Sequence, residues 1–124
     1  MIIAIGTDIV EIARITKSLE KFGKTFEQRI FTDSERSIAE KKPSKAAHYA
    51  KRFAAKEAAA KELGTGFSDG VSWHDIEISS HASGKPLITL YGKAKALVGE
   101  NANIHLSLSD DAGLAIAYVL IESP

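Results

Sequence analysis

The chain has 124 residues, a length typical of one domain that buries its own hydrophobic core. Its sixteen Lys and Arg residues balance sixteen Asp and Glu residues, so the overall charge predicts neither nucleic-acid nor membrane binding. The absence of cysteine excludes disulfides, thiolate zinc sites and cysteine nucleophiles.

The most apolar segments indicate neither export nor a membrane span. The first residues, MIIAIGTD, lack a basic region and reach an acid at Asp8, unlike a signal peptide. The run LAIAYVLI at 114–121 is too short to cross a bilayer. We therefore expect a soluble, cytoplasmic protein that forms a single domain over residues 1–124.

The first part of the chain predicts one strand followed by helices. The apolar run IIAI at 2–5 is typical of a buried strand, which we expect to end at Gly6. Apolar side chains at spacings of three and four predict an amphipathic helix over 11–22. A short helix or turn is expected at 25–31.

Two further helices are indicated by their N-terminal residues. Thr32 and Glu35 form a capping-box pattern for a helix that must end before Pro43. Ser44 is a suitable N-cap for a long helix over 45–63, where alanine and long straight side chains dominate.

The second half of the chain changes to the period of strands. We expect a loop at 64–70, a helix at 92–100, and strands at 71–79, 87–91, 103–109 and 114–121. The last two strands flank the turn DDAG and predict an antiparallel hairpin. This order of elements predicts an α+β fold.

Charged residues surround the long helix in a pattern with two interpretations. Arg52 and Lys56 are like charges four residues apart, which destabilises an isolated helix. Glu57 and Lys61 could form an ordinary surface ion pair at the same spacing. Alternatively, the cations hold a polyanion and Glu57 holds a metal cation. Spacing alone leaves both interpretations open.

Asp8 is a carboxylate among hydrophobic neighbours, and a lone half-buried carboxylate is costly unless it has a partner. It could be the N-cap of a helix that begins near Ile9. It could instead bind a hard cation at the end of the first strand. Together with Glu57 it would suit Mg²⁺, which prefers few carboxylates, retained water and substrate phosphates.

Other familiar site patterns are missing from the sequence. The four histidines have no His or Cys partner at metal spacing, so zinc is not expected. Serine-hydrolase, P-loop and dinucleotide-binding motifs do not occur, and the aromatic residues form no stacking platform for RNA.

A row of basic residues accompanies the first predicted helix. Its members are Arg14, Lys17, Lys21 and Lys24. Such residues are commonly just solvent-facing. In a chain without net charge they could also dock an acidic partner.

Five segments, in this order, resemble bacterial holo-acyl-carrier-protein synthases of the 4′-phosphopantetheinyl transferase superfamily, almost from end to end. They are GTDIVEIARI at 6–15, IFTDSE at 30–35, RFAAKEAAAKELGTG at 52–66, GKPLI at 84–88 and HLSLSDDAGLAIAYVLIE at 105–122. The resemblance implies a fold in which an antiparallel sheet packs against a long helix and shorter helices. It also implies transfer of 4′-phosphopantetheine from coenzyme A to a serine of apo acyl carrier protein, releasing adenosine 3′,5′-bisphosphate and supporting fatty acid biosynthesis.

The resemblance assigns roles to residues at matching positions. Asp8 and Glu57 are expected to bind Mg²⁺, and Lys61 to contact the pyrophosphate and assist the leaving group, so that these three are the catalytic residues. The remaining residues expected to bind coenzyme A are Arg52, Lys56, Gly64, Pro86 and Ser109. The attacking serine belongs to the carrier protein, and its proton could pass to Glu57 or to a metal-bound water.

The same resemblance implies partners and an assembly. Acyl carrier proteins are acidic, so Arg14, with Lys17, Lys21 and Lys24, is expected to dock the carrier. Family members are usually homotrimers with sites between subunits. Many of them have a histidine where this chain has Asp110, which leaves the role of that position open.

Two other functions compete with this interpretation. The chain could bind coenzyme A or a carrier protein without transferring the group, or it could be an adaptor that uses only its basic helix. Intact Asp8, Glu57 and Lys61 favour the enzyme, because a binder needs no metal pair.

Overall fold

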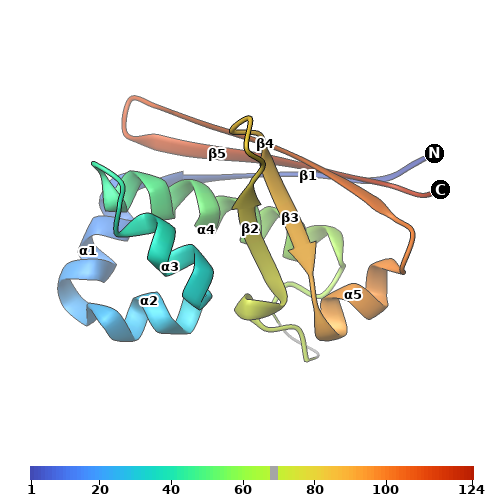
Figure 1. Cartoon of the computed structure of the whole chain (residues 1–124), viewed down its shortest axis with the longest axis horizontal. Coiled ribbons are helices and arrows are strands. Elements are labelled where there is room, and N and C mark those ends of the chain that lie inside the picture. Colours follow the sequence, from blue (N-terminus) through green and yellow to red (C-terminus); the bar gives the residue numbers. More distant parts are fainter. Residues whose placement is uncertain (68–69) are drawn as a thin grey trace.

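Two antiparallel sheets and a long helix form the framework of the computed structural model, which describes residues 1–67 and 70–124 (Figure 1). The larger sheet has the order β1-β5-β4 and contains β1 (Ile2–Glu11), β4 (Asn103–Asp111) and β5 (Leu114–Glu122). The smaller sheet pairs β2 (Ile76–Ser80) with β3 (Pro86–Leu90). The α+β class is as predicted.

The helices lie on one side of the larger sheet (Figure 1). They are α1 (Ile12–Phe22), α2 (Lys24–Ile30), α3 (Asp33–Ala39), α4 (Lys45–Glu62) and α5 (Gly92–Val98), with a 3-10 turn, η1, at Trp73–Asp75. Helix α4 runs along the sheet, α1 to α3 gather at one end of the molecule, and α5 lies at the other. None of the helices in the described ranges is long and apolar enough to cross a membrane.

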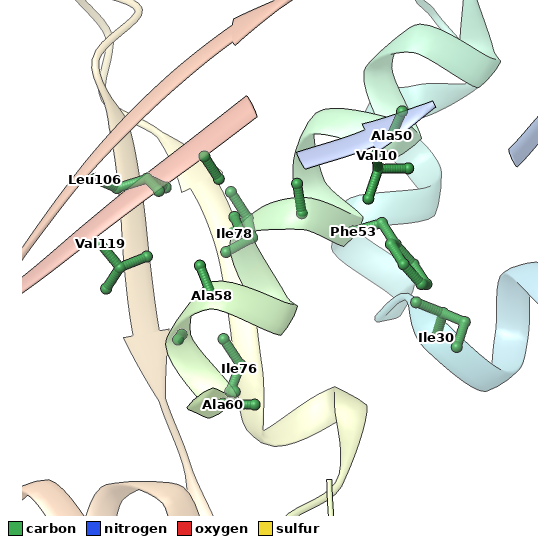
Figure 2. Packing of buried hydrophobic residues seen from close by; sticks show 14 of the residues in the cluster. Val10, Ile30, Ala50, Phe53, Ala58, Ala60, Ile76, Ile78, Leu106 and Val119 are labelled. Carbon is green, nitrogen blue, oxygen red and sulfur yellow. The ribbon is translucent and has the colours of Figure 1, made fainter. Parts of the chain in front are cut away.

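The core lies between α4 and the larger sheet, where small side chains allow a close approach. Strand β5 turns four fully buried or nearly buried residues toward the helix, namely Ala115, Ala117, Val119 and Ile121. The alanines of α4 pack against this face, and Val119 lies opposite Ala58 in Figure 2. The side chain of Glu62 lies over Gly6 of β1, where a Cβ atom would come within 2.4 Å of its Oε1. Helix and sheet therefore approach one another closely across small side chains.

Several local predictions are confirmed. Thr32 and Glu35 form the capping box of α3, with the Thr32 N–H donating to Oε1 of Glu35 over 2.8 Å. The Oγ of Ser44 accepts a hydrogen bond from the Ala47 N–H and caps α4. Strands β4 and β5 form the expected hairpin.

The first strand is longer than predicted, and Asp8 is not a helix cap. Strand β1 continues through Gly6 to Glu11, where α1 begins, because β5 offers it a partner along this whole length. Asp8 pairs with Ala117 in that ladder. A ladder with a long neighbouring strand outweighs the local preference of glycine and aspartate for a turn.

The predicted strand at 71–79 begins only at Ile76. The residues before it form η1, in which the Asp75 carboxylate accepts a hydrogen bond from the Ser72 N–H. Trp73 stacks against Phe53 and Phe67, so the segment turns toward α4 and does not extend along β3. The predicted loop at 64–70 includes residues 68–69, which lie outside the described residues.

Candidate functional site

Asp8 lies on the face of β1 that is turned toward α4. Strand side chains alternate between faces, and Asp8 shares the inner face with Ala4, Gly6 and the buried Val10. The Nζ of Lys61 in the last turn of α4 lies 2.9 Å from Oδ1 of Asp8. The Asp8 side chain is 14% exposed, whereas that of Lys61 is 56% exposed. The aspartate thus lies below the surface with an exposed cation above it.

Glu57 lies one turn before Lys61 on α4 and completes this group. Burial raises the pKa of its carboxyl, and the negative charge of Asp8 acts in the same direction. The positive charges of Arg14 and Lys61 oppose that rise. Two acids that are 49 positions apart in the chain therefore share one site. Lys61 forms its ion pair across to β1 with Asp8, although the charge of Glu57 also acts on it.

The two carboxylates fit a divalent cation. Glu57 and Asp8 repel one another in a partly buried position, and a cation between them would relieve that repulsion. Within the described ranges, no group of three or more His, Cys, Asp or Glu side chains comes together to hold a metal. A donor set of two carboxylates suits Mg²⁺, which keeps water and substrate phosphates as its other ligands.

A second region, the cationic cavity, lies beside the N-terminal half of α4. It encloses about 560 Å³. It is lined by Lys42, Pro43, Ser44, Ala47, His48, Lys51, Arg52, Ser80, Gly84, Pro86 and Leu108. Two of the residues predicted to bind coenzyme A, Arg52 and Pro86, therefore share one cavity although they come from different elements. Three cations line it, which makes it suited to a phosphate group.

Two features of the cationic cavity were not predicted. His48 is only 6% exposed, and burial lowers its pKa to about 4, with the surrounding cations acting in the same direction. Lys51 forms an ion pair with Asp110 at the end of β4, with 3.1 Å between Nζ and Oδ1. Sequence spacing contains no signal for this pair, because the two residues are joined only by the packing of β4 against α4.

Lys56 does not contact a phosphate site, and that prediction is wrong. Its side chain is 0% exposed, and its Nζ lies 2.8 Å from Oε1 of Glu35. It also donates to the carbonyl oxygens of Trp73 and Ile76, over 3.0 and 2.5 Å. Glu35 in turn accepts the N–H of Ile78 over 2.7 Å. Lys56 thus joins α4 to α3, η1 and β2 inside the core.

Gly64 and Ser109 lie outside the cationic cavity. Gly64 follows Lys61 just beyond the end of α4, where its φ of +81° favours glycine. Ser109 is exposed on β4, and the alternation of strand side chains places it on the opposite face from Leu108, which lines the cavity. Ser109 therefore lies on the outer face of the larger sheet.

The two carboxylates Asp8 and Glu57, here called the acid pair, and the cationic cavity lie on different sides of α4. Arg52 and Lys61 are nine residues apart, which at about 100° per residue places them on opposite faces of the helix. Lys61 and Glu57 are turned toward β1, whereas Arg52 is turned toward β4 and the β2–β3 turn. One chain alone therefore does not place both groups around one small ligand.

The basic row of α1 is exposed and adjoins a groove. Arg14, Lys17, Lys21 and Lys24 are all solvent-exposed. The groove encloses about 370 Å³ and is lined by Arg14, Ser18, Phe22, Thr25, Phe26, Arg29, Ile30, Phe53 and Trp73. The Arg14 guanidinium lies 5.7 Å from the Phe53 ring centre, and its charge reaches Glu57. The basic row therefore reaches the neighbourhood of Glu57 through Arg14.

The sequence and structure are both similar to known proteins. The family model of the 4′-phosphopantetheinyl transferase superfamily matches residues 4–119. A holo-[acyl-carrier-protein] synthase of Methylobacterium sp. (strain 4-46) is 48% identical, over 99% of this chain and 96% of that protein.

Two solved structures resemble the chain closely. One is the Helicobacter pylori holo-[acyl-carrier-protein] synthase in complex with coenzyme A, which is 37% identical with a TM-score of 0.85. The match covers 96% of this chain and 100% of the Helicobacter pylori chain. The other is a Bacillus anthracis holo-(acyl-carrier-protein) synthase in complex with CoA (3′,5′-ADP), 38% identical with a TM-score of 0.84. The match covers 100% of this chain and 99% of the Bacillus anthracis chain.

Proposed function

The chain belongs to the 4′-phosphopantetheinyl transferase superfamily, and from that premise we propose that it transfers 4′-phosphopantetheine from coenzyme A to a serine of apo acyl carrier protein with the help of Mg²⁺. The observation that carries the proposal is the meeting of Asp8, Glu57 and Lys61 in one partly buried site. This arrangement suits phosphoryl transfer, where positioning and neutralisation of charge provide most of the rate enhancement.

Each residue of the site has a separate task. Asp8 and Glu57 would hold Mg²⁺, which supplies charge neutralisation on the phosphate oxygens when bound. Lys61 would leave Asp8 for the pyrophosphate and stabilise the charge that develops on the leaving group. The carrier serine forms a new oxygen–phosphorus bond, the pyrophosphate bond breaks, and adenosine 3′,5′-bisphosphate and a proton are released.

The adenosine end of coenzyme A is assigned to the cationic cavity. Its 3′-phosphate would be bound by Arg52 and the neighbouring lysines, with Pro86 against the adenosine. The solved relative that contains CoA (3′,5′-ADP) supports a site for this end of the molecule in the family.

The working form is a homotrimer in which each site lies between two copies. Arg52 and Lys61 lie on opposite faces of α4, so one ligand reaches both groups most simply if they come from different copies. The outer face of the larger sheet also exposes large apolar side chains. Ile3, Ile5, Ile9 and Tyr118 are each more than half exposed. Such a patch is typical of a subunit interface. Ser109 lies on the same face.

The carrier protein is assigned to α1. An acidic carrier complements Arg14 and the lysines of the basic row, and the adjoining groove offers Phe22 and Phe26 for apolar contacts. Arg14 lies closest to the acid pair, which would place the carrier serine near the pyrophosphate. The activity would serve fatty acid biosynthesis in the cytoplasm.

The direct test is incubation with coenzyme A, Mg²⁺ and apo acyl carrier protein, followed by mass spectrometry of the carrier. We expect the added phosphopantetheine arm with Mg²⁺ and an unmodified carrier with a chelator. Asp8→Ala and Glu57→Ala should each reduce transfer by about 10³-fold or more, because each removes a metal ligand, while circular dichroism shows an intact fold. Activity that survives in both variants would refute the metal assignment.

A mixing experiment tests the site between copies. Glu57→Ala and Arg52→Ala damage different halves of the site, so the homotrimer of each variant should have low transfer activity. Mixed trimers contain some interfaces with both halves intact, and transfer should recover in part after subunit exchange. A mixture of Glu57→Ala with Asp8→Ala is the matched control, because both changes damage the same half and no intact site forms. Equal activity in the two mixtures would contradict the interface.

A further inference from the structure

We propose that Asp110 sets the affinity of the cationic cavity for a phosphate monoester, because it holds Lys51 in an ion pair that must open before Lys51 can contact the ligand. The inference rests on the proposed function, since it concerns the site assigned to the 3′-phosphate of coenzyme A. It assigns a role to Asp110, a position whose role the sequence left open.

The ion pair joins two elements at the edge of the cationic cavity. Lys51 projects from α4 and lines the cavity, whereas Asp110 lies at the end of β4. Their charged atoms are 3.1 Å apart. The Lys51 side chain is 28% exposed and that of Asp110 is 37% exposed, so the pair is partly shielded and still free to open. Solvent screens a pair in this position less than a fully exposed one, and opening it costs less than breaking a buried one.

The pair changes the charge that a ligand meets. The described lining contains three cations, Lys42, Lys51 and Arg52. Asp110 neutralises one of them, and His48 is uncharged at neutral pH because burial lowers its pKa to about 4. While the pair is closed, a phosphate monoester would therefore meet two cations, Lys42 and Arg52, that form no ion pair with the described residues. It would meet three if Asp110 did not hold Lys51.

The ligand predicted to respond is the one with a terminal phosphate. The pyrophosphate is assigned to Lys61, which is ten positions further along α4. Only the 3′-phosphate would compete with Asp110 for Lys51. Dephospho-coenzyme A lacks that group and keeps the pyrophosphate, so it separates an effect in the cavity from a general effect of charge.

The experiment measures the Kd of coenzyme A and of dephospho-coenzyme A by titration calorimetry. The proteins are the wild type, Asp110→Asn, Lys51→Met and the double variant. We expect Asp110→Asn to bind coenzyme A about two- to fivefold more tightly, the range set by a partly exposed ion pair. Dephospho-coenzyme A should bind with an unchanged Kd, and most of the gain should disappear when Lys51 is also replaced. Asp111→Asn is the matched control, because it removes the same charge from the adjacent, exposed position.

Each other outcome overturns the inference in a distinguishable way. The wild type could bind coenzyme A while Asp110→Asn binds it with an unchanged or higher Kd. That result would show that the ion pair does not restrain Lys51, and the proposed function would stand. An equal gain in Asp111→Asn, or an undiminished gain in the Lys51→Met background, shows repulsion by the carboxylate and not control of Lys51. Failure of the wild type to bind coenzyme A removes the proposed function and the inference together.

Discussion

Lys56 and Lys61 lie five residues apart on the same helix, and their surroundings differ completely. Lys56 is fully buried, and Glu35 and two carbonyl oxygens bind its ammonium group. Lys61 is more than half exposed and has one ion-pair partner, Asp8. The helix turns about 140° between them, which directs Lys56 into the core and Lys61 toward β1.

This difference separates a structural lysine from one that can serve a ligand. The ammonium group of Lys56 already has three partners, and releasing it would leave the buried Glu35 carboxylate without its ion-pair partner. Lys61 can leave Asp8 at a smaller cost, because water solvates its exposed ammonium group when the pair opens. Two lysines of the same sequence motif therefore have different functions: Lys56 stabilises the core, and Lys61 is available to a ligand.

The largest effect is expected from the buried pair. Lys56→Met should reduce the free energy of unfolding by about 3–5 kcal/mol, because Glu35 keeps its charge in the core and loses its cation. Urea denaturation monitored by circular dichroism measures the change. Lys61→Met on the same helix is the matched control. A loss as small as the control's would show that Glu35 is adequately solvated without Lys56.

His48 in the cavity wall should show an intermediate effect. Its pKa is about 4 in the folded chain and 6.5 in the unfolded chain. The unfolded chain therefore binds more protons between these values, and the wild type loses stability as the pH falls through this window. The loss should reach about 2 kcal/mol at pH 4, allowing for partial solvent screening.

The variant His48→Gln isolates that contribution. Glutamine does not titrate, so the stability of the wild type relative to the variant should be constant above pH 6.5 and should decline between pH 6.5 and pH 4. Urea denaturation at several pH values gives the difference, in which the shared carboxylates cancel. A difference that stays constant across the whole range would mean that His48 protonates in the folded chain as easily as in the unfolded one.

The smallest effect on stability belongs to Lys61. Lys61→Met should change the free energy of unfolding by about 1 kcal/mol, well below the loss expected for Lys56→Met, because the Lys61 ammonium group is more than half exposed. Transfer to the carrier protein should nevertheless fall by about tenfold or more, because the leaving group loses its cation. A variant that is strongly destabilised and still fully active would reverse the comparison with Lys56.

The local elements with clear signals were predictable. Ser44 and the Thr32–Glu35 box mark the starts of α4 and α3, and the β4–β5 hairpin follows from its alternating pattern. The extent of β1 was not predictable from local residues, because Gly6 and Asp8 both disfavour strands. The long pairing with β5 decides it, and that interaction joins opposite ends of the chain.

The sequence by itself determined the α+β class, the family resemblance and the candidate acids Asp8 and Glu57. These depend on local periodicity and on residue types at fixed spacing, which a linear pattern contains. Only the tertiary structure decided that Lys56 is buried with Glu35, that Lys51 pairs with Asp110, and that Arg52 and Lys61 lie on opposite faces of α4. The physical reason is that burial and charge pairing depend on which distant elements pack together, and helix periodicity alone does not say which face meets the core.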